Sequence, residues 1–309
     1  SMAAFFDSLY SITDTVRIGG GVRLTHDKRS MTHVITPPTA VITRNDFSES
    51  WTEPTGRAVI EWKAADQLFV YGSYNRGYKA GGYDTFARSP LGLGVINPET
   101  VDSFEVGFKS DWWNKRLRLN VAGFRTNIKD YQLSALVDPV LVISRATNAG
   151  DIQSTGFEAE LSVRPTEWFG INAAYGDTDS KFDSDIIIDA AGTNLNGLYV
   201  PRTPKETYGL GVDFRVPVGG GTLDGSASYT HRDEVFGEAN NNLMQLIPRT
   251  NVLDANVGWL SSSGRWELRL WGRNLTDEDI ILQIAAAGGA PSAVYAPPRS
   301  YGVTATLRN

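Results

Sequence analysis

The sequence predicts an all-β protein, a transmembrane antiparallel up-and-down β-barrel, and three observations lead to that prediction. Short turns alternate with long polar loops along the chain. The segments between them alternate apolar and polar residues with the period of two typical of strands. Most of the eight Trp residues lie near a short turn, where an aromatic girdle would meet the membrane boundary. We expect this girdle to consist of Trp62, Trp112, Trp113, Trp168, Trp259 and Trp266.

The order of turns and loops divides the chain into about thirteen strands. They are expected near residues 3–12, 16–29, 56–63, 67–79, 100–110, 116–129, 143–164, 168–176, 205–216, 221–232, 249–260, 265–276 and 298–309. The long loops are expected at 30–55, 80–99, 130–143, 177–204, 233–248 and 277–297. The first and last strands both run toward the short turns, so their number is odd. A complete bacterial barrel has an even number, and we therefore expect the sequence to begin partway around one.

The polar face of each strand is expected to line a water-filled lumen. In the segment 265–274, Leu268 and Leu270 fall on one face and Glu267 and Arg269 on the other. A soluble sheet would show the same split, with its apolar face in a core, so this alternative stays open. In a wide barrel the apolar face meets lipid and the polar face bounds the lumen. The lumen-facing or plug-facing candidates are Arg116, Arg118, Glu158, Glu160, Asp213, Arg215, Glu267, Arg269 and Arg273.

Composition excludes several classes of protein. The 309 residues contain no Cys, carry a net charge of −6 and show no basic patch, which argues against a nucleic-acid partner. The mean hydropathy of −0.24 fits barrel strands that average to mildly polar. No run approaches about 18 apolar residues, so a helical membrane span is excluded. No signal peptide is recognisable, and we expect Ser1 and Met2 to be a cloning remnant, with the barrel occupying residues 3–309.

No motif indicates catalysis. The three His residues lie in no recognisable motif with a nucleophile, and the glycines at 19–21 lack the Lys of a phosphate loop. Glu158 and Glu160 could suggest a glycosidase, but carboxylates of a wet lumen are the simpler interpretation. We expect no enzyme activity, no catalytic residue, no cofactor and no metal site.

Several stretches resemble a known family. They are 69–83 (FVYGSYNRGYKAGGY), 97–100 (NPET) with 104–109 (FEVGFK), 148–150 (NAG) with 154–161 (STGFEAEL), 200–205 (VPRTPK) and 272–277 (GRNLTD). In this order they resemble the C-terminal part of the β-barrel of TonB-dependent outer-membrane receptors.

The resemblance implies a fragment of a barrel of roughly 22 strands, of which about 12–14 are present. In that family an N-terminal plug fills the barrel and carries a box that contacts TonB, and this sequence shows neither. The implied partners are outer-membrane lipid, the plug, TonB and the barrel-assembly machinery. Family chains end in an aromatic residue, so Asn309 at this position is expected to weaken the assembly signal.

The resemblance implies energised uptake of a scarce nutrient across the outer membrane of a Gram-negative bacterium. A ferric siderophore is expected first, with cobalamin, an oligosaccharide or an aromatic compound as other ligands. Aromatic and charged residues of the long loops suit such a small molecule or metal chelate. A passive porin-like channel and a soluble all-β carbohydrate-binding or hydrolytic module stay open as alternatives. The loop candidates are Tyr78, Tyr83, Phe86, Arg88, Tyr131, Arg232 and Asp233.

A partial barrel has two open edges. Each unpaired backbone group in lipid costs several kcal/mol. We therefore expect either that the chain recloses into a narrower barrel of about twelve to fourteen strands or that its edges pair with another chain.

Overall fold

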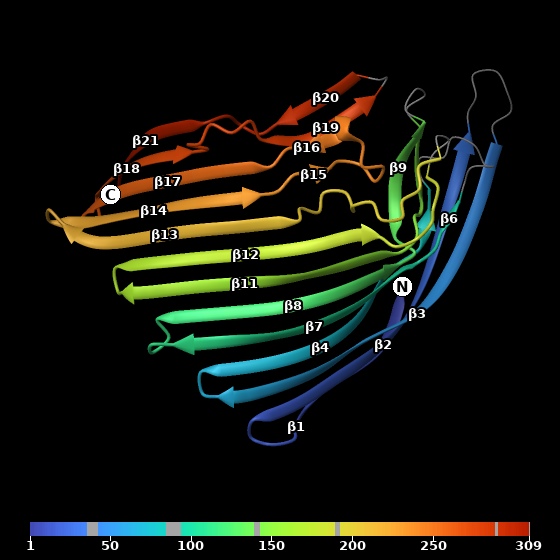
Figure 1. Cartoon of the computed structure of the whole chain (residues 1–309), viewed down its shortest axis with the longest axis horizontal. Helices are drawn as coiled ribbons and strands as arrows, with labels where there is room; N and C mark the ends of the chain where they lie inside the picture. The colour runs from blue at the N-terminus through green and yellow to red at the C-terminus, as the bar shows by residue number, and fades with distance from the viewer. Residues whose placement is uncertain (36–42, 85–93, 139–142, 189–191, 288–289, 309) are drawn as a thin grey trace.

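One large antiparallel sheet forms the body of the molecule. The computed structural model describes residues 1–35, 43–84, 94–138, 143–188, 192–287 and 290–308. Thirteen strands pair in chain order, which confirms the predicted number (Figure 1). They are β1 (Met2–Ser11), β2 (Val16–Ile35), β3 (Thr43–Ala65), β4 (Leu68–Lys79), β7 (Glu99–Trp112), β8 (Leu117–Lys129), β11 (Ile152–Thr166), β12 (Phe169–Phe182), β13 (Glu206–Val218), β14 (Gly221–Arg232), β17 (Thr250–Ser261), β18 (Trp266–Arg273) and β21 (Ser300–Leu307).

The long connections carry small hairpins of their own, all at one end of the sheet (Figure 1). The opposite end has only tight turns, as the sequence predicts. No described helix is long and apolar enough to cross a membrane. The hairpins are β5 (Gly82–Tyr83) with β6 (Val95–Ile96), β9 (Gln132–Asp138) with β10 (Ile143–Asn148), β15 (Val235–Phe236) with β16 (Leu246–Ile247), preceded by the 3₁₀ turn η2 (Leu243–Gln245), and β19 (Ile281–Ala287) with β20 (Ala290–Tyr295).

Two predicted elements differ most from the structure. The predicted loop at 30–55 is mostly strand, because β2 and β3 continue as one long hairpin in unbroken register from Val16–Trp62 to Ile35–Thr43. The predicted strand at 143–164 is two strands, β10 and β11. Between them Gly150 has a φ of +79°, a conformation that ends a strand and that glycine adopts without strain.

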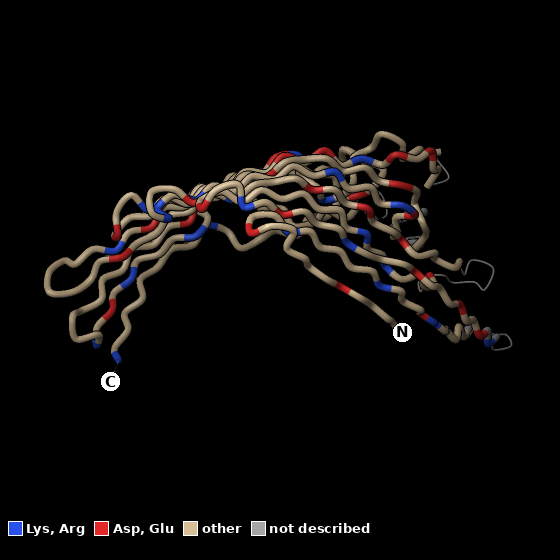
Figure 2. The backbone as a smooth tube through the Cα atoms, turned by 90° about the horizontal axis from the view of Figure 1, so that it is seen from below, with Lys and Arg blue, Asp and Glu red and all other residues tan. Residues whose placement is uncertain are grey.

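The sheet is curved and open, so the first of the two expected outcomes, a reclosed narrower barrel, is wrong, and pairing of the edges with another chain stays a prediction. Figure 2 shows an arch whose two arms bend to the same side. The strand order begins at β1 and ends at β21, and these two do not pair with each other. With thirteen alternating strands, β1 and β21 run in the same direction. Closing the sheet on itself would require a parallel seam in an otherwise antiparallel sheet, and parallel pairing is slightly less stable per residue.

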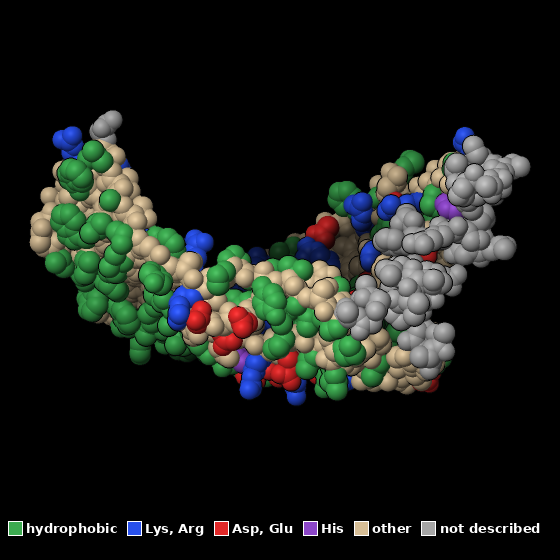
Figure 3. Space-filling view, turned by 90° about the horizontal axis from the view of Figure 1, so that it is seen from above, with side chains coloured by type: hydrophobic (Ala, Val, Ile, Leu, Met, Phe, Trp, Pro, Cys, Tyr) green, Lys and Arg blue, Asp and Glu red, His purple; other side chains and the backbone are tan. Residues whose placement is uncertain are grey.

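The two faces of the sheet differ in polarity. Cross-strand register places Leu210, Leu268, Leu270 and Val303 on one face, and each of these side chains is at least half exposed. Figure 3 shows hydrophobic side chains gathered on the outer, convex side of the arch, most densely over its left arm. No second sheet covers this face among the described residues, so a β-sandwich with a shared core is wrong. A single layer with an exposed apolar face is the arrangement that lipid stabilises.

Aromatic rows border the apolar band on both sides. Near the tight turns, Trp62, Trp112 and Trp266 are about half exposed. Near the long loops, the rings of Tyr74 and Phe104 lie 4.8 Å apart, and further convex-face pairs follow on β11 to β14. Along β13 the band runs ten residues from Tyr208 to Val218. At roughly 3.3 Å per residue and a tilt of about 40° this spans about 25 Å, the height of a barrel's apolar belt.

Cysteine cross-linking tests the open sheet, since the chain has no native Cys. We expect Ser8→Cys in β1 and Ala305→Cys in β21, which both lie on the convex face, to form no intramolecular disulfide, because the two edges are not paired. Ser103→Cys with Thr126→Cys is the control, because these residues face each other on β7 and β8 with hydroxyl oxygens 2.9 Å apart. Non-reducing gel mobility and mass spectrometry measure disulfide formation in both double-cysteine variants. Efficient edge-to-edge cross-linking in the monomer would show that the barrel closes.

Candidate functional site

The concave face near the tight turns is covered by ion pairs, most of them between neighbouring or next-neighbouring strands. Charged groups at this end of the wall therefore neutralise one another inside the sheet. Most are partly exposed, so each pair contributes modestly to stability. The pairs are Arg17–Glu61 (2.6 Å), Asp7–Arg57 (2.7 Å), Asp111–Arg118 (2.8 Å), Arg164–Asp213 (3.3 Å), Asp224–Arg269 (3.0 Å), Glu267–Arg269 (3.3 Å) and Glu267–Arg308.

Three of these pairs pass over a glycine in the strand between them. Gly258 of β17 lies in register with both Asp224 of β14 and Arg269 of β18. A Cβ on Gly258 would lie 2.7 Å from the Arg269 guanidinium carbon, so only glycine leaves room for the bridge. The same arrangement occurs twice more, with Gly21 beneath the Asp7–Arg57 pair and Gly170 beneath the Arg164–Asp213 pair.

Toward the long loops the concave face of the central strands changes from ion pairs to hydroxyl groups. Ser103 and Thr126 hydrogen-bond across β7 and β8. On β13, β14 and β17, Thr207, Thr230 and Thr250 occupy concave positions. The wall therefore has a zone of paired charges near the turns and a zone rich in hydroxyl groups near the loops.

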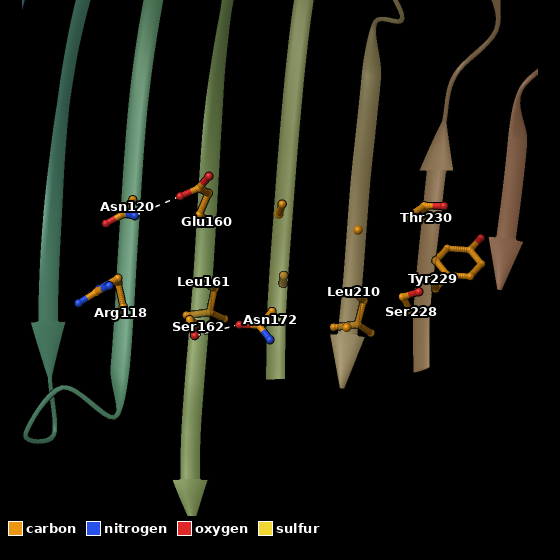
Figure 4. Close-up of a pocket in the computed structure, with 14 residues that line it drawn as sticks. Arg118, Asn120, Glu160, Leu161, Ser162, Asn172, Leu210, Ser228, Tyr229 and Thr230 are labelled. Carbon is orange, nitrogen blue, oxygen red and sulfur yellow. Dashed lines mark hydrogen bonds between the residues drawn. The ribbon is translucent and has the colours of Figure 1, made fainter. Parts of the chain in front are cut away.

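A groove of about 390 Å³ lies in the concave wall where the two zones meet (Figure 4). Its floor is made by Ala174 of β12 and by Gly209 and Gly211 of β13, which leave the backbone uncovered. On one side Asn120 of β8 donates a hydrogen bond to Glu160 of β11 at 3.1 Å, and Ser162 donates one to Asn172 at 2.9 Å. On the other side Ser228 and Thr230 rise from β14. The volume falls in the range of small-molecule sites, roughly 300–1,000 Å³.

Two charges without an ion pair flank this groove. One cross-strand row contains Glu158 of β11, Gly176, Thr207 and Arg232 of β14, so the two charges are three strand spacings, roughly 14 Å, apart. Arg232 donates a hydrogen bond to the Pro248 carbonyl at 3.2 Å, and its Nε is buried without a partner. Within the described residues, neither Glu158 nor Arg232 forms an ion pair. Neither charge is therefore neutralised by a charge of opposite sign in the described part of the wall.

Hydrogen bonds tie the loop hairpins to one another above this wall. The Asn97 amide donates to the Asn148 side chain at 2.8 Å, and Asn148 donates back to the Asn97 carbonyl at 3.1 Å. Gln132 donates to the carbonyls of Ala80 and Asn97 at 3.1 and 3.0 Å. The β5–β6 and β9–β10 hairpins are thus fixed together at their bases.

A small apolar core supports the next loops along the rim. It consists of the buried side chains of Ala149, Ile152, Phe182, Leu195 and Ala239. The ring of Tyr131 packs against Phe182 with centroids 6.1 Å apart, and burial raises the pKa of its hydroxyl. Asn241 holds residue 199 by accepting from its amide at 2.8 Å and donating to its carbonyl at 2.9 Å. These contacts make the loop rim one connected structure.

The predicted loop residues divide into packed and open groups. Tyr78 donates a hydrogen bond to Asp27, and Tyr131 packs in the rim core, so both stabilise the loops. Tyr83 lies in β5 with its ring 6.0 Å from that of Phe47. Asp233 lies 3.9 Å from His231, whereas Arg232 forms no ion pair in the described part of the chain. Phe86 and Arg88 lie outside the described residues.

The predicted lumen residues all share the concave face except Arg116, which lies in the turn after β7 and donates to the Pro165 carbonyl. Arg273 lies at the Trp271 ring, 6.0 Å from its centroid, and Arg215 is exposed without an ion-pair partner among the described residues. Five of the predicted girdle Trp side chains are exposed: Trp62, Trp112, Trp113, Trp168 and Trp266. Trp259 is the exception, since its indole N–H donates to the Val218 carbonyl at 3.1 Å.

The sequence interpretation missed the groove floor and the loop contacts. Gly209 and Gly211 are visible as small members of a polar face, but their position beside Ala174 depends on cross-strand register. Gln132 and Asn241 act across long sequence distances and leave no local pattern, whereas Asn148 lies in the family-like stretch 148–150, which does not reveal its contact with Asn97. Within the described residues, no cluster of His, Cys, Asp and Glu could hold a metal ion.

Comparison with known proteins identifies the family. The family model described as "TonB dependent receptor-like, beta-barrel" matches residues 1–275. The chain belongs to this family. Its members are transport receptors rather than enzymes, and the chain is an outer-membrane protein of a Gram-negative bacterium.

Curated relatives and solved structures agree with this family. The chain is 26% identical to the pesticin receptor of Yersinia pestis over 90% of this chain and 39% of that protein. It is 30% identical to the ferric-pyoverdine M114 receptor of a Pseudomonas strain over 76% of this chain and 27% of that protein. The ferric yersiniabactin uptake receptor of Yersinia pestis superimposes with a TM-score of 0.84 at 23% identity, covering 99% of this chain and 45% of that one. The chain thus spans less than half the length of these relatives.

Replacing Gly258 tests the bridges over glycine. We expect Gly258→Ala to displace the Asp224–Arg269 pair and to lower the free energy of unfolding by about 1 kcal/mol. Gly211→Ala is the matched control, because a Cβ there meets no atom closer than 3.8 Å. Urea unfolding in lipid vesicles measures both variants. Equal stabilities would show that the bridge over Gly258 contributes nothing.

Removing one side chain tests the connection between loops. We expect Asn148→Ala to raise the hydrogen-exchange rate of the Asn97 amide by roughly fivefold, the equivalent of one net hydrogen bond of about 1 kcal/mol. Asn241→Ala is the control, because it should release the Tyr199 amide instead. Exchange followed by mass spectrometry reports both segments. An unchanged Asn97 amide in Asn148→Ala would contradict the assignment.

Proposed function

We propose that the chain forms part of an outer-membrane receptor for a ferric chelate, whose uptake depends on TonB. The observation that carries this proposal is the groove beside Arg232, which lies in the concave wall beneath a connected loop rim. An open rim above a lined wall is the arrangement that a receptor needs to capture a small molecule and pass it into the lumen.

The charges of the wall favour an anionic ligand. Arg232 lies in the same cross-strand row as Thr207 and Thr250, and guanidinium and hydroxyl groups together bind carboxylate, catecholate or phosphate oxygens well. Glu158 across the groove would repel a negative group, so the anionic end of the ligand should lie toward β14. The ferric-siderophore relatives support a ferric chelate as the ligand class.

Energy for uptake would come from outside this chain. A family plug inside the arch would meet the concave face, where Arg118, Asp213 and Arg269 each form an ion pair within the sheet and Arg215 forms none among the described residues. We propose that the unpaired charges, rather than the bridged ones, form the contacts that change when TonB acts on the plug.

A pair of iron complexes of similar size tests the proposed function. We expect the full chain in detergent to bind the trianionic tris(catecholato)iron complex more tightly than the neutral tris(acetohydroxamato)iron complex, measured by quenching of Trp fluorescence. Arg232→Gln should weaken binding of the anion by about tenfold, because it removes a charge-assisted contact. Gly209→Val should weaken both complexes by filling the groove.

Matched controls separate local effects from general ones. Arg249→Gln makes the same change of charge on an exposed neighbour, and Gly77→Val adds the same side chain where a Cβ meets no atom within 4 Å. Both should bind like the wild type. If the wild type and Arg232→Gln both bound the two iron complexes with equal affinity, Arg232 would have no role in binding the anion.

A further inference from the structure

The convex face carries a second hollow, of about 910 Å³, on the side that meets the membrane. Its floor lacks bulky side chains at Ala58, Gly72 and Gly123, which occupy convex positions on β3, β4 and β8. Ile60 and Val106 form its apolar sides. A hollow of this lining in the middle of a lipid-facing sheet fits hydrocarbon chains.

The end of the hollow nearest the long loops is aromatic and cationic. Tyr74 and Phe104 border it, and Phe104 lies in register with Arg125 of β8. Arg125 is exposed and forms no ion pair or hydrogen bond through its side chain within the described residues. Its neighbour on the same face, Arg76, is instead paired with Asp102 at 2.8 Å. Arg125 thus places an uncompensated positive charge at the border of an apolar hollow.

The height of Arg125 corresponds to a headgroup layer. It lies eight residues beyond Leu117, the first residue of β8 at the tight-turn end. At roughly 3.3 Å per residue and a tilt of about 40°, this is about 20 Å across the membrane. Because long loops face the cell exterior in bacterial barrels, Arg125 lies near the headgroups of the outer leaflet.

The hollow and Arg125 together fit one kind of molecule, which has apolar chains at one end and a negatively charged group at the other. An arginine snorkelling at the boundary attracts a phosphate, and the apolar hollow below it stabilises the acyl chains of the same molecule. A protein partner would require a polar rim around the hollow, which its sides at Ile60 and Val106 do not offer. We propose that this hollow is a binding site for a phosphorylated lipid of the outer leaflet, with its phosphate at Arg125 and its acyl chains over Gly72 and Gly123.

Native mass spectrometry of the full chain tests this lipid site. The detergent-solubilised chain is mixed with equal amounts of diphosphorylated lipid A and dipalmitoylphosphatidylcholine, and the retained lipids are counted. We expect the wild type to retain lipid A preferentially. Arg125→Gln should lower this retention by at least about fivefold, since it removes the unpaired positive charge that would contact the phosphate. Gly123→Leu should reduce retention of both lipids by filling the hollow, and its Cβ has space, with the nearest atom 3.9 Å away.

The controls separate this site from general charge and from free phosphate. Arg265→Gln removes an exposed arginine at the opposite, tight-turn end and should retain lipid A like the wild type. Excess inorganic phosphate should not displace the lipid, because it lacks acyl chains. Circular dichroism should show unchanged strand content in every variant. An equal loss in Arg265→Gln, displacement by phosphate, or no preference for lipid A by the wild type would overturn the proposal.

Discussion

Backbone hydrogen bonding within a single layer is the constraint on which the rest of the structure depends. In hydrocarbon no water satisfies an exposed N–H or C=O, so every strand needs two neighbours. The eleven inner strands have them, whereas β1 and β21 each have one. Because thirteen is odd, these two edges run in the same direction, and a second copy in the same membrane orientation presents the same two directions. An antiparallel closure therefore needs a partner with an odd number of strands, whose two outer strands run toward the long loops.

The same single layer explains why the two faces are so different. A side chain on either face of the sheet has no packed core behind it, so contact with lipid or with the contents of the lumen determines whether it is apolar or polar. On the convex face this gives the apolar band between two aromatic rows. On the concave face it allows ion pairs such as Asp224–Arg269 to lie flat on the sheet, provided that the strand between them carries glycine. Glycine in these strands thus leaves room for the ion pairs that cross above it.

Alternation with a period of two was sufficient to predict the number, order and facing of the thirteen strands, because each strand repeats the same split between lipid and lumen. It could not locate the break at Gly150, since alternation continues through β10 into β11 while the chain turns. It also could not find the groove, because Gly209 and Ala174 become neighbours only through register. Of the loop candidates, Tyr131 illustrates the limit best: an aromatic residue in a polar loop suggested a ligand contact, yet it packs on Phe182 in the rim core.

The distribution of compensated and uncompensated charges links the wall to transport. A wall of free charges would bind an occupant tightly and hold it, whereas a wall of mutually paired charges presents little net field to it. Near the tight turns Arg164 and Asp213 neutralise each other, so movement of an occupant past them breaks no strong contact. Closer to the long loops, Glu158 and Arg232 form no ion pair within the described residues and lie on opposite sides of the groove. Binding and release can then be controlled at a few positions, while the surrounding sheet keeps its own hydrogen bonds and ion pairs intact throughout.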